Sequence, residues 1–236
     1  MYLVIDTSTD TAGLAIIANG CLIAEETWRC VRNQSVELLP HLVSLLTKAQ
    51  VDLPKITGVV IALGPGGFNS LRVGLGTAKG LAFGLDLPLV GVSTLAATAY
   101  QCYPAEPPVC AVLPAGRTEA AWAVYQASGG KWQNILPENI SNPDDICSYV
   151  NIPTIITGEA DDELVQQICI KLGELAITPP RLSKSRVHAL AELGTQRLDE
   201  GEHDDVATLQ PIYLRRPPIT MPKSKATGLQ SLLPPS

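Results

Sequence analysis

Two groups of residues in the first part of the chain have the types and spacing to bind an anion or a cation. Residues 64–67 read Gly-Pro-Gly-Gly, follow an apolar run at 58–63 and open a helical pattern. The free N–H groups at a helix start, together with its positive dipole end, suit an anion. Asp6 ends another short apolar run, and its carboxylate could hold Mg²⁺ as hard oxygen sites do. Asp6, Gly66 and Gly67 are therefore the candidates for contact with a nucleotide or an anion.

Neither group completes a catalytic motif. The glycine loop lacks G-x-x-x-x-G-K-[ST], and Asn69 stands where G-x-G-x-x-G requires its last glycine. Asp6 is better interpreted as a turn residue that accepts hydrogen bonds from nearby N–H groups. His41, His188 and His203 lack the spacing of metal ligands, and the sequence contains no G-x-S-x-G elbow. We therefore expect neither catalytic residues nor a metal site.

The helical pattern after the loop carries three glycines four residues apart. Gly76, Gly80 and Gly84 share one helix face, and each costs the helix roughly 1 kcal/mol relative to alanine. Close packing of another backbone against this bare face is the simplest compensation, and the alternative is packing inside the lobe itself. Arg72, near the start of the same helix, could bind a phosphate or a carboxylate of a partner. The pattern indicates a surface for a partner more than a reaction.

Composition limits the classes of function. The 236 residues are 46% hydrophobic, which is enough for one large domain or two small lobes. A net charge of −6 argues against autonomous nucleic-acid binding, which needs clustered Lys and Arg. Apolar runs are too short for a membrane span, and the start of the chain has no basic region of a signal peptide. We expect a cytoplasmic protein whose scattered cysteines are reduced.

Two halves of the chain repeat one pattern. Residues 1–103 begin with three strands, of which two join at an Asn-Gly hairpin signal at 19–20, and continue with alternating helices and strands. A proline-containing break at 103–108 precedes a second half, 104–216, which also begins with a meander. The pattern leaves two alternatives open, two similar lobes or a single mixed sheet with an inserted hairpin. Residues 217–236 hold five prolines and are expected to be disordered.

Six short segments carry a recognisable signature in a fixed order. They are Leu-Val-Ile-Asp-Thr-Ser-Thr at 3–9, Ser-Val-Glu-Leu-Leu-Pro at 35–40, Gly-Pro-Gly-Gly-Phe at 64–68 with Leu-Arg-Val-Gly at 71–74, Ala-Lys-Gly-Leu-Ala at 78–82, Gly-Val-Ser-Thr-Leu at 91–95, and Pro-Ile-Tyr-Leu-Arg at 211–215. Together they closely resemble the bacterial TsaB family, the dimerisation subunit for threonylcarbamoyladenosine synthesis on tRNA. The match is dense over 2–95, thin over 96–205, and returns near 211–215.

The resemblance implies an α/β fold of the actin-like, sugar-kinase-like (ribonuclease H-like) kind, with two lobes whose mixed sheets are flanked by helices. It implies a missing active site and a non-catalytic subunit that docks on, and supports, a catalytic threonylcarbamoyltransferase paralogue in a heterodimer. An accessory ATPase subunit would be a further partner, and tRNA would be reached only through the complex. ATP or ADP would bind at the complex junction and not to this chain alone. The resemblance leaves open a homodimer of free chains.

The same resemblance places the docking surface on the helices at about 34–50 and 69–85. The helix at about 185–200 is a candidate to pack back on the first lobe. In one turn, residues 114–117, this chain has Pro-Ala-Gly-Arg where the family usually has Asp-Ala-Arg, which puts a nucleotide or third-subunit contact there in doubt. The residues expected at the partner interface are Leu42, Leu46, Arg72, Gly76, Gly80, Phe83 and Gly84.

Two enzymatic functions remain as alternatives. A small ATPase or kinase of the same fold would use Asp6 and the glycine loop. A metallopeptidase-like protein is a weaker alternative because paired metal ligands are missing from the sequence.

Overall fold

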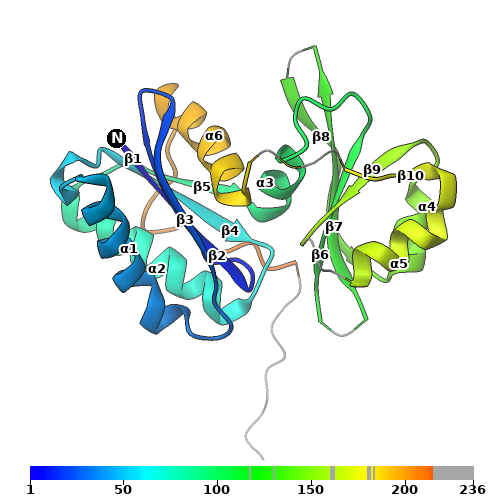
Figure 1. The fold of residues 1–236 in the computed structure, drawn as a ribbon, viewed down its shortest axis with the longest axis horizontal. Coiled ribbons are helices and arrows are strands. Elements are labelled where there is room, and N and C mark those ends of the chain that lie inside the picture. The colour runs from blue at the N-terminus through cyan, green and yellow to red at the C-terminus, as the bar shows by residue number, and fades with distance from the viewer. Residues whose placement is uncertain (117, 130, 160–162, 180–181, 183, 215–236) are drawn as a thin grey trace, which may run out of the picture.

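The chain folds into two lobes, each built on a five-stranded sheet (Figure 1). The computed structural model describes residues 1–214, with the exception of 117, 130, 160–162, 180–181 and 183. Within these described residues, no helix combines the length and the apolar character needed to cross a bilayer. Arg117 and the segment 217–236, which the sequence predicts to be disordered, lie outside the described residues.

The first sheet grows from alternating apolar strands at the start of the chain. Its order is β3-β2-β1-β4-β5, in which β1 is antiparallel to β2 and parallel to β4. The β2–β3 hairpin turns at Asn19 and Gly20, which have the positive φ angles (51° and 73°) that such a two-residue turn requires. The strands are β1 Tyr2–Asp6, β2 Thr11–Ala18, β3 Cys21–Arg29, β4 Gly58–Gly64 and β5 Leu89–Ser93.

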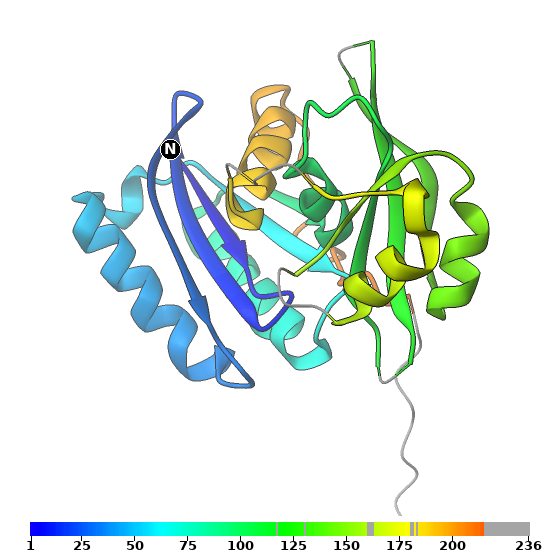
Figure 2. The ribbon, with the colours of Figure 1, turned by 45° about the vertical axis from the view of Figure 1, so that its right-hand side comes forward.

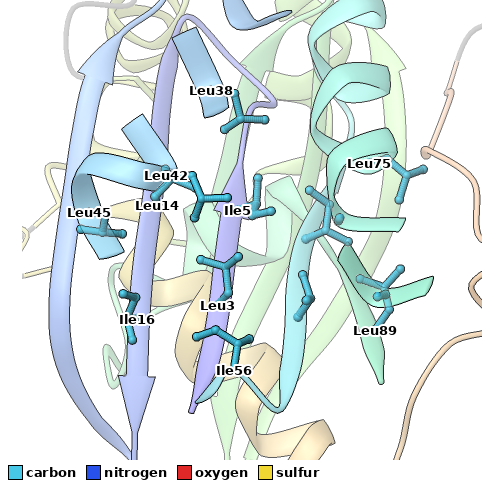
Figure 3. Packing of buried hydrophobic residues seen from close by; sticks show 14 of the residues in the cluster. Leu3, Ile5, Leu14, Ile16, Leu38, Leu42, Leu45, Ile56, Leu75 and Leu89 are labelled. Atoms are coloured by element: carbon cyan, nitrogen blue, oxygen red, sulfur yellow. The ribbon is translucent and has the colours of Figure 1, made fainter. Parts of the chain in front are cut away.

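Helices cover both faces of this sheet. Because strand side chains alternate, Leu3 and Ile5 pack under α1 (Gln34–Ala49) and α2 (Phe68–Leu85), as Figure 3 shows. Val4 points the other way and packs against α6 (Arg186–Asp199). A short 3₁₀ turn, η1 (Leu53–Lys55), connects α1 to β4.

The second sheet repeats the topology of the first. Its order is β10-β9-β6-β7-β8, so the strand that begins each sheet lies at its centre, between an antiparallel and a parallel neighbour. The two-lobe alternative is therefore correct, and the single mixed sheet is wrong. The elements are β6 Val109–Pro114, β7 Ala120–Ser128, β8 Lys131–Ser141, α4 Pro143–Tyr149, β9 Thr154–Thr157, α5 Glu163–Leu172, η2 Gly173–Leu175 and β10 Ala176–Ile177.

Two helices lie between the sheets, while α1, α2, α4 and α5 lie on the outer faces (Figures 1 and 2). Helix α3 (Thr94–Tyr100) follows β5, but its Leu95 and Ala99 belong to the apolar core of the second lobe. Helix α6 comes late in the chain, yet it packs on β1, β2, β4 and β5. The lobes are thus joined through α3 and α6, which contact one another.

The segment after α6 covers the β5 edge of the first sheet. Asp204 forms an isolated bridge with Leu89, and the N–H of Ile212 donates to the carbonyl of Leu63 over 2.8 Å. Val206 and Ile212 pack against the core under α2. Ile212 of the Pro-Ile-Tyr-Leu-Arg segment is therefore a structural part of the first lobe, whereas Leu214 packs against the core of the second lobe.

Candidate functional site

The outer face of α1 and α2 is an exposed apolar surface. Val36, Leu39 and Val43 are 71%, 54% and 63% exposed, at the i, i+3, i+7 spacing of one helix stripe. Phe83 of α2 is 87% exposed. Large apolar side chains that are exposed together on one face generally mark a contact with a partner. We call the surface formed by these four residues and by the three α2 glycines at positions 76, 80 and 84 the docking face.

The α2 glycines open onto solvent and not onto the core. A Cβ added at Gly76, Gly80 or Gly84 would have no described atom within 4 Å, apart from the adjacent backbone of its own helix. The glycine face therefore does not pack inside the lobe.

Of the two α1 leucines expected at the partner interface, Leu42 is buried in the core of the first lobe, whereas Leu46 is half-buried at the edge of that core. Leu42 is only 4% exposed and packs with Leu38 and Leu45 onto the first sheet, and Leu46 packs against the same core. The five leucines at 38, 39, 42, 45 and 46 span an arc of roughly 120°, and the two at one edge of it, Leu39 and Leu46, are less buried than the other three. Val36, Leu39 and Val43 were missed, although their phase opposite the Leu38–Leu42–Leu45 stripe could have revealed them.

Arg72 lies at the start of α2 and is exposed, but it contacts the C-terminal segment. Its guanidinium lies 3.7 Å from the ring centre of Phe68, and its Nε donates to the hydroxyl of Tyr213 over 3.2 Å. The Phe68 and Tyr213 rings are 5.2 Å apart. Arg72 therefore connects Tyr213 to the N-terminal end of α2.

A shallow groove of about 510 Å³ adjoins the docking face at Gly80. One wall is the C-terminal segment, held by a hydrogen bond of 3.1 Å from Lys79 Nζ to the carbonyl of Ala207. The groove is lined by Lys79, Gly80, Phe83, Asp205, Val206 and Ala207. The exposed ring of Phe83 thus stands beside a hollow at Gly80, which is a shape that a partner side chain could fill.

Substitution by alanine should change the free energy of unfolding in opposite directions at two glycines of α2. A Cβ at Gly74 would lie 2.1 Å from Oγ1 of Thr7, which is buried and donates to the carbonyl of Ser70 over 2.7 Å. We expect Gly74→Ala to lower the free energy of unfolding by roughly 1–3 kcal/mol through overpacking. Gly76→Ala should raise it by up to about 1 kcal/mol, because the helix gains propensity without a clash. Urea denaturation of both variants measures this; a change of the same sign in the two would refute the assignment of faces.

Two cavities of about 760 Å³ and 540 Å³ lie between the lobes. Gly66, Gly67 and Arg29 line the larger cavity, whereas Asp6 and Arg186 line the smaller one. Thr11 and Glu159 line both. The polar cluster around Glu159 therefore lies where the two cavities meet, and the three candidates for nucleotide or anion contact do not face one cavity together.

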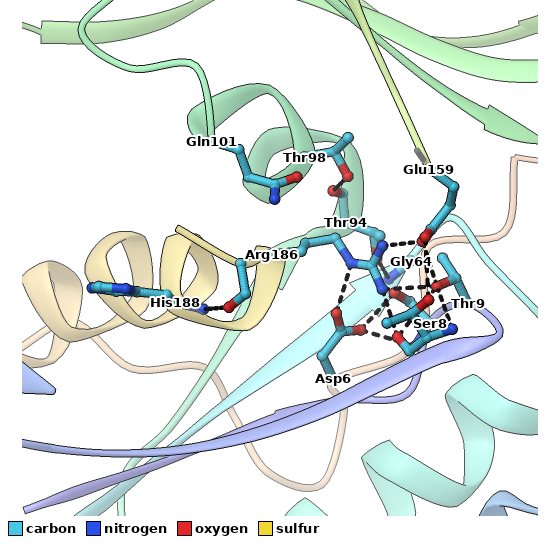
Figure 4. Close-up of polar contacts among 12 residues, drawn as sticks. Asp6, Ser8, Thr9, Gly64, Thr94, Thr98, Gln101, Glu159, Arg186 and His188 are labelled. Atoms are coloured by element: carbon cyan, nitrogen blue, oxygen red, sulfur yellow. Dashed lines mark hydrogen bonds and ion pairs between the residues drawn. The ribbon is translucent and has the colours of Figure 1, made fainter. Parts of the chain in front are cut away.

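Asp6 is buried, and its two carboxylate oxygens already have partners (Figure 4). Oδ1 accepts from the N–H and the hydroxyl of Ser8 over 2.9 and 2.6 Å, as expected of a turn residue. Oδ2 accepts from Nε of Arg186 over 2.7 Å, a contact that the sequence did not indicate because 180 residues separate the two. Asp6 in this arrangement does not fit the role of a metal or nucleotide ligand.

The glycine loop is packed against the turn that follows β1. The N–H of Gly67 donates to the carbonyl of Ser8 over 2.8 Å, and a Cβ on Gly66 would lie 2.1 Å from that same oxygen. One N–H group predicted to bind an anion is therefore already used within the chain. Gly66 and Gly67 remain exposed at the edge of the larger cavity.

The histidines do not converge in the structure either. His41 stacks on Trp28 with ring centres 4.0 Å apart, and its Nδ1 lies 2.7 Å from Oε1 of Glu26. His188 lies 3.4 Å from Glu192 on α6. Among the described residues, no group of three or more His, Cys, Asp or Glu side chains is placed to hold a metal ion.

The fold and a family match define the class of this protein. Residues 29–196 match the family model described as TsaD, tRNA N6-adenosine threonylcarbamoyltransferase. The structure of YeaZ from Pseudomonas aeruginosa is similar with a TM-score of 0.71 and 25% identity, covering 90% of this chain and 99% of that chain. The expected α/β fold of the actin-like, sugar-kinase-like kind is confirmed. The chain is a relative of the tRNA threonylcarbamoyltransferases.

Sequence identity to curated relatives shows to which family within this class the chain belongs. The tRNA threonylcarbamoyladenosine biosynthesis protein TsaB of Bacillus subtilis is 30% identical over 217 residues, which are 90% of this chain and 93% of that relative. A tRNA N6-adenosine threonylcarbamoyltransferase of Symbiobacterium thermophilum is 32% identical over 154 residues, but only 56% of this chain and 44% of that relative are covered. The chain belongs to the TsaB family, which confirms the resemblance carried by the six segments.

Proposed function

We propose that this chain is a non-catalytic subunit in the synthesis of threonylcarbamoyladenosine on tRNA, and that it docks on a catalytic paralogue through the docking face. The observation that carries the proposal is the exposed stripe of Val36, Leu39 and Val43 beside the open α2 glycines. Bare glycines let a second backbone approach closely, and the dispersion attraction between the two surfaces then adds up over many atoms. The groove at Gly80 supplies a receptor for one protruding side chain of the partner.

A paralogue is a suitable partner because a related fold offers related helices at the same place. Two such faces can meet about a pseudo-twofold axis, in the way that identical faces meet in a symmetric dimer. The same reasoning makes a homodimer of free chains the competing use of this surface. An accessory ATPase and tRNA would then join through the assembled complex, with ATP or ADP at the subunit junction.

We assign the threonylcarbamoyl transfer reaction to the partner because the residues of this chain do not suit catalysis. Asp6 is bound by Arg186 and Ser8, which opposes its use by an ATPase or kinase. The histidines lie at 41, 188 and 203, without the i, i+4 pairing of a helical metal site. The net charge of −6 disfavours tight tRNA binding by the isolated chain.

Reconstitution tests the proposal. The purified chain, its catalytic paralogue from the same organism, and both together are supplied with tRNA and the activated threonylcarbamoyl donor. Mass spectrometry of the digested tRNA then measures the modified nucleoside. We expect no product from the chain alone and faster formation with both proteins than with the paralogue alone. Product from this chain free of partner, or a paralogue rate that the chain does not change, would contradict the proposal.

A further inference from the structure

One buried arginine connects the two lobes at the cleft (Figure 4). Arg186 is the first residue of α6, which packs on the first sheet, and its side chain is only 9% exposed. Its Nε donates to Asp6, at the end of β1, over 2.7 Å. Its Nη1 donates to Glu159, which follows β9 of the second lobe. A single guanidinium thus bridges carboxylates from opposite lobes.

The rest of this arrangement also uses polar groups from the first lobe. Nη2 of Arg186 donates over 2.8 Å to Oγ1 of Thr9 and over 2.8 Å to the carbonyl of Thr11. The hydroxyls of Thr9 and Thr11 donate to the two oxygens of Glu159 over 2.7 and 3.2 Å. Glu159 is therefore the single carboxylate through which the second lobe is held at this point.

The side chains of this cluster stabilise one another in their ionised forms. Burial by itself would lower the pKa of the Arg186 guanidinium, but Asp6 and Glu159 outweigh that effect and raise it. Burial by itself would raise the pKa of Glu159, but the charge of Arg186 and the hydrogen bonds from Arg186, Thr9 and Thr11 together outweigh burial, so the pKa lies below its usual range. Breaking such a pair on one side leaves an uncompensated buried charge, which is strongly unfavourable.

A second contact between the lobes has different chemistry. There, Leu95 and Ala99 of α3 pack into the apolar core of the second lobe. A hydrogen bond from the hydroxyl of Ser93, just before α3, to Glu138 of β8 also joins the lobes there. The ion pair between Arg186, at the start of α6, and Glu159, just beyond β9, constrains the width of the cleft, because its geometry tolerates little displacement.

We propose that Arg186 is an internal cation that fastens Glu159 of the second lobe to Asp6 of the first and keeps the cleft in one closed arrangement. The position between the two carboxylates is one that a divalent cation bound by oxygen ligands would suit. In this chain the guanidinium of Arg186 occupies that position. The docking face is consequently presented by a molecule whose shape does not depend on a metal or nucleotide in this cleft.

The variant Arg186→Met removes the charge and retains an unbranched apolar side chain. We expect it to melt roughly 10 °C lower and to scatter X-rays in solution as a more open particle than the original protein. Mg²⁺ or Mn²⁺ should raise its melting temperature by about 5–10 °C at a hundredfold excess over the dissociation constant, because Asp6 and Glu159 then share the ion. The original protein should show no such response.

Three further variants make the test specific. Arg197→Met on the same helix is the matched control, since its partners Glu202 and Asp204 lie in the first lobe, and it should leave scattering and metal response unchanged. Glu159→Gln should open the cleft without creating a metal response, and combining it with Arg186→Met should abolish that response. Unchanged scattering of both Arg186→Met and Glu159→Gln would overturn the proposal. Glu159→Gln decides the matter by itself if Arg186→Met does not fold.

Discussion

Gly80→Leu is expected to abolish association with the catalytic paralogue while leaving this chain folded. Gly80 is the middle glycine of the docking face and forms part of the groove lining. A leucine there would hold two backbones apart and fill the hollow beside Phe83, which removes the close approach on which the dispersion attraction depends. We expect the dissociation constant to rise at least about 30-fold, the effect of losing roughly 2 kcal/mol at an interface hot spot.

The folded state of this variant should not suffer. Leucine has a higher helix propensity than glycine, and the structure shows open space at this position. The matched control is Gln167→Leu, which adds an exposed leucine to α5 in the second lobe and should leave binding unchanged. Titration of the paralogue by calorimetry and melting by circular dichroism measure the two effects. A lowered melting temperature with binding retained would show that the glycines serve internal packing instead.

Replacement by alanine should affect stability at Leu42 of α1 but partner binding at Leu39. Leu42→Ala should lower the free energy of unfolding by about 2–5 kcal/mol, since it removes a buried side chain from the core of the first lobe. Leu39→Ala should change it by no more than about 0.5 kcal/mol, because this side chain is 54% exposed. The second variant should instead weaken the association with the paralogue.

Urea denaturation and partner titration of both variants complete this comparison. The position of Leu39 in the exposed stripe predicts a loss of affinity with an unchanged unfolding midpoint. If Leu39→Ala destabilised the chain as much as Leu42→Ala, α1 would face the sheet in a different phase from the one described. If it left affinity unchanged, the exposed stripe would have another use.

Local patterns in the sequence predicted the parts of the fold that depend on neighbouring residues. The Asn-Gly signal at 19–20 predicted the first hairpin, because few other residues tolerate its backbone angles. The glycines four residues apart predicted an open helix face for the same kind of local reason. The meander at the start of each half was compatible with two lobes but did not exclude a single mixed sheet, and only the strand pairing in the structure decides between them.

Local sequence patterns could not predict contacts between segments that are distant along the chain. The hydrogen-bonded ion pair between Asp6 and Arg186 joins residues 180 positions apart. No local sequence pattern around either residue predicts the other as its partner. The phase of α1 was also misjudged, because five leucines within nine positions fit more than one helix face. Leu42 was expected at the partner interface for that reason, although it packs in the core of the first lobe.

The late position of α6 has a consequence for how the protein is made on the ribosome. The first sheet cannot cover the face that carries Val4 and Val60 until residues 186–199 have been synthesised. At about 5–20 residues per second, the roughly 80 residues between the end of the first half and α6 take on the order of 4–16 s. During that interval the nascent first lobe exposes apolar surface, which makes it a natural substrate for chaperones. A shortened transcript ending after α3 would encode a chain with the docking helices but no completed lobe to support them.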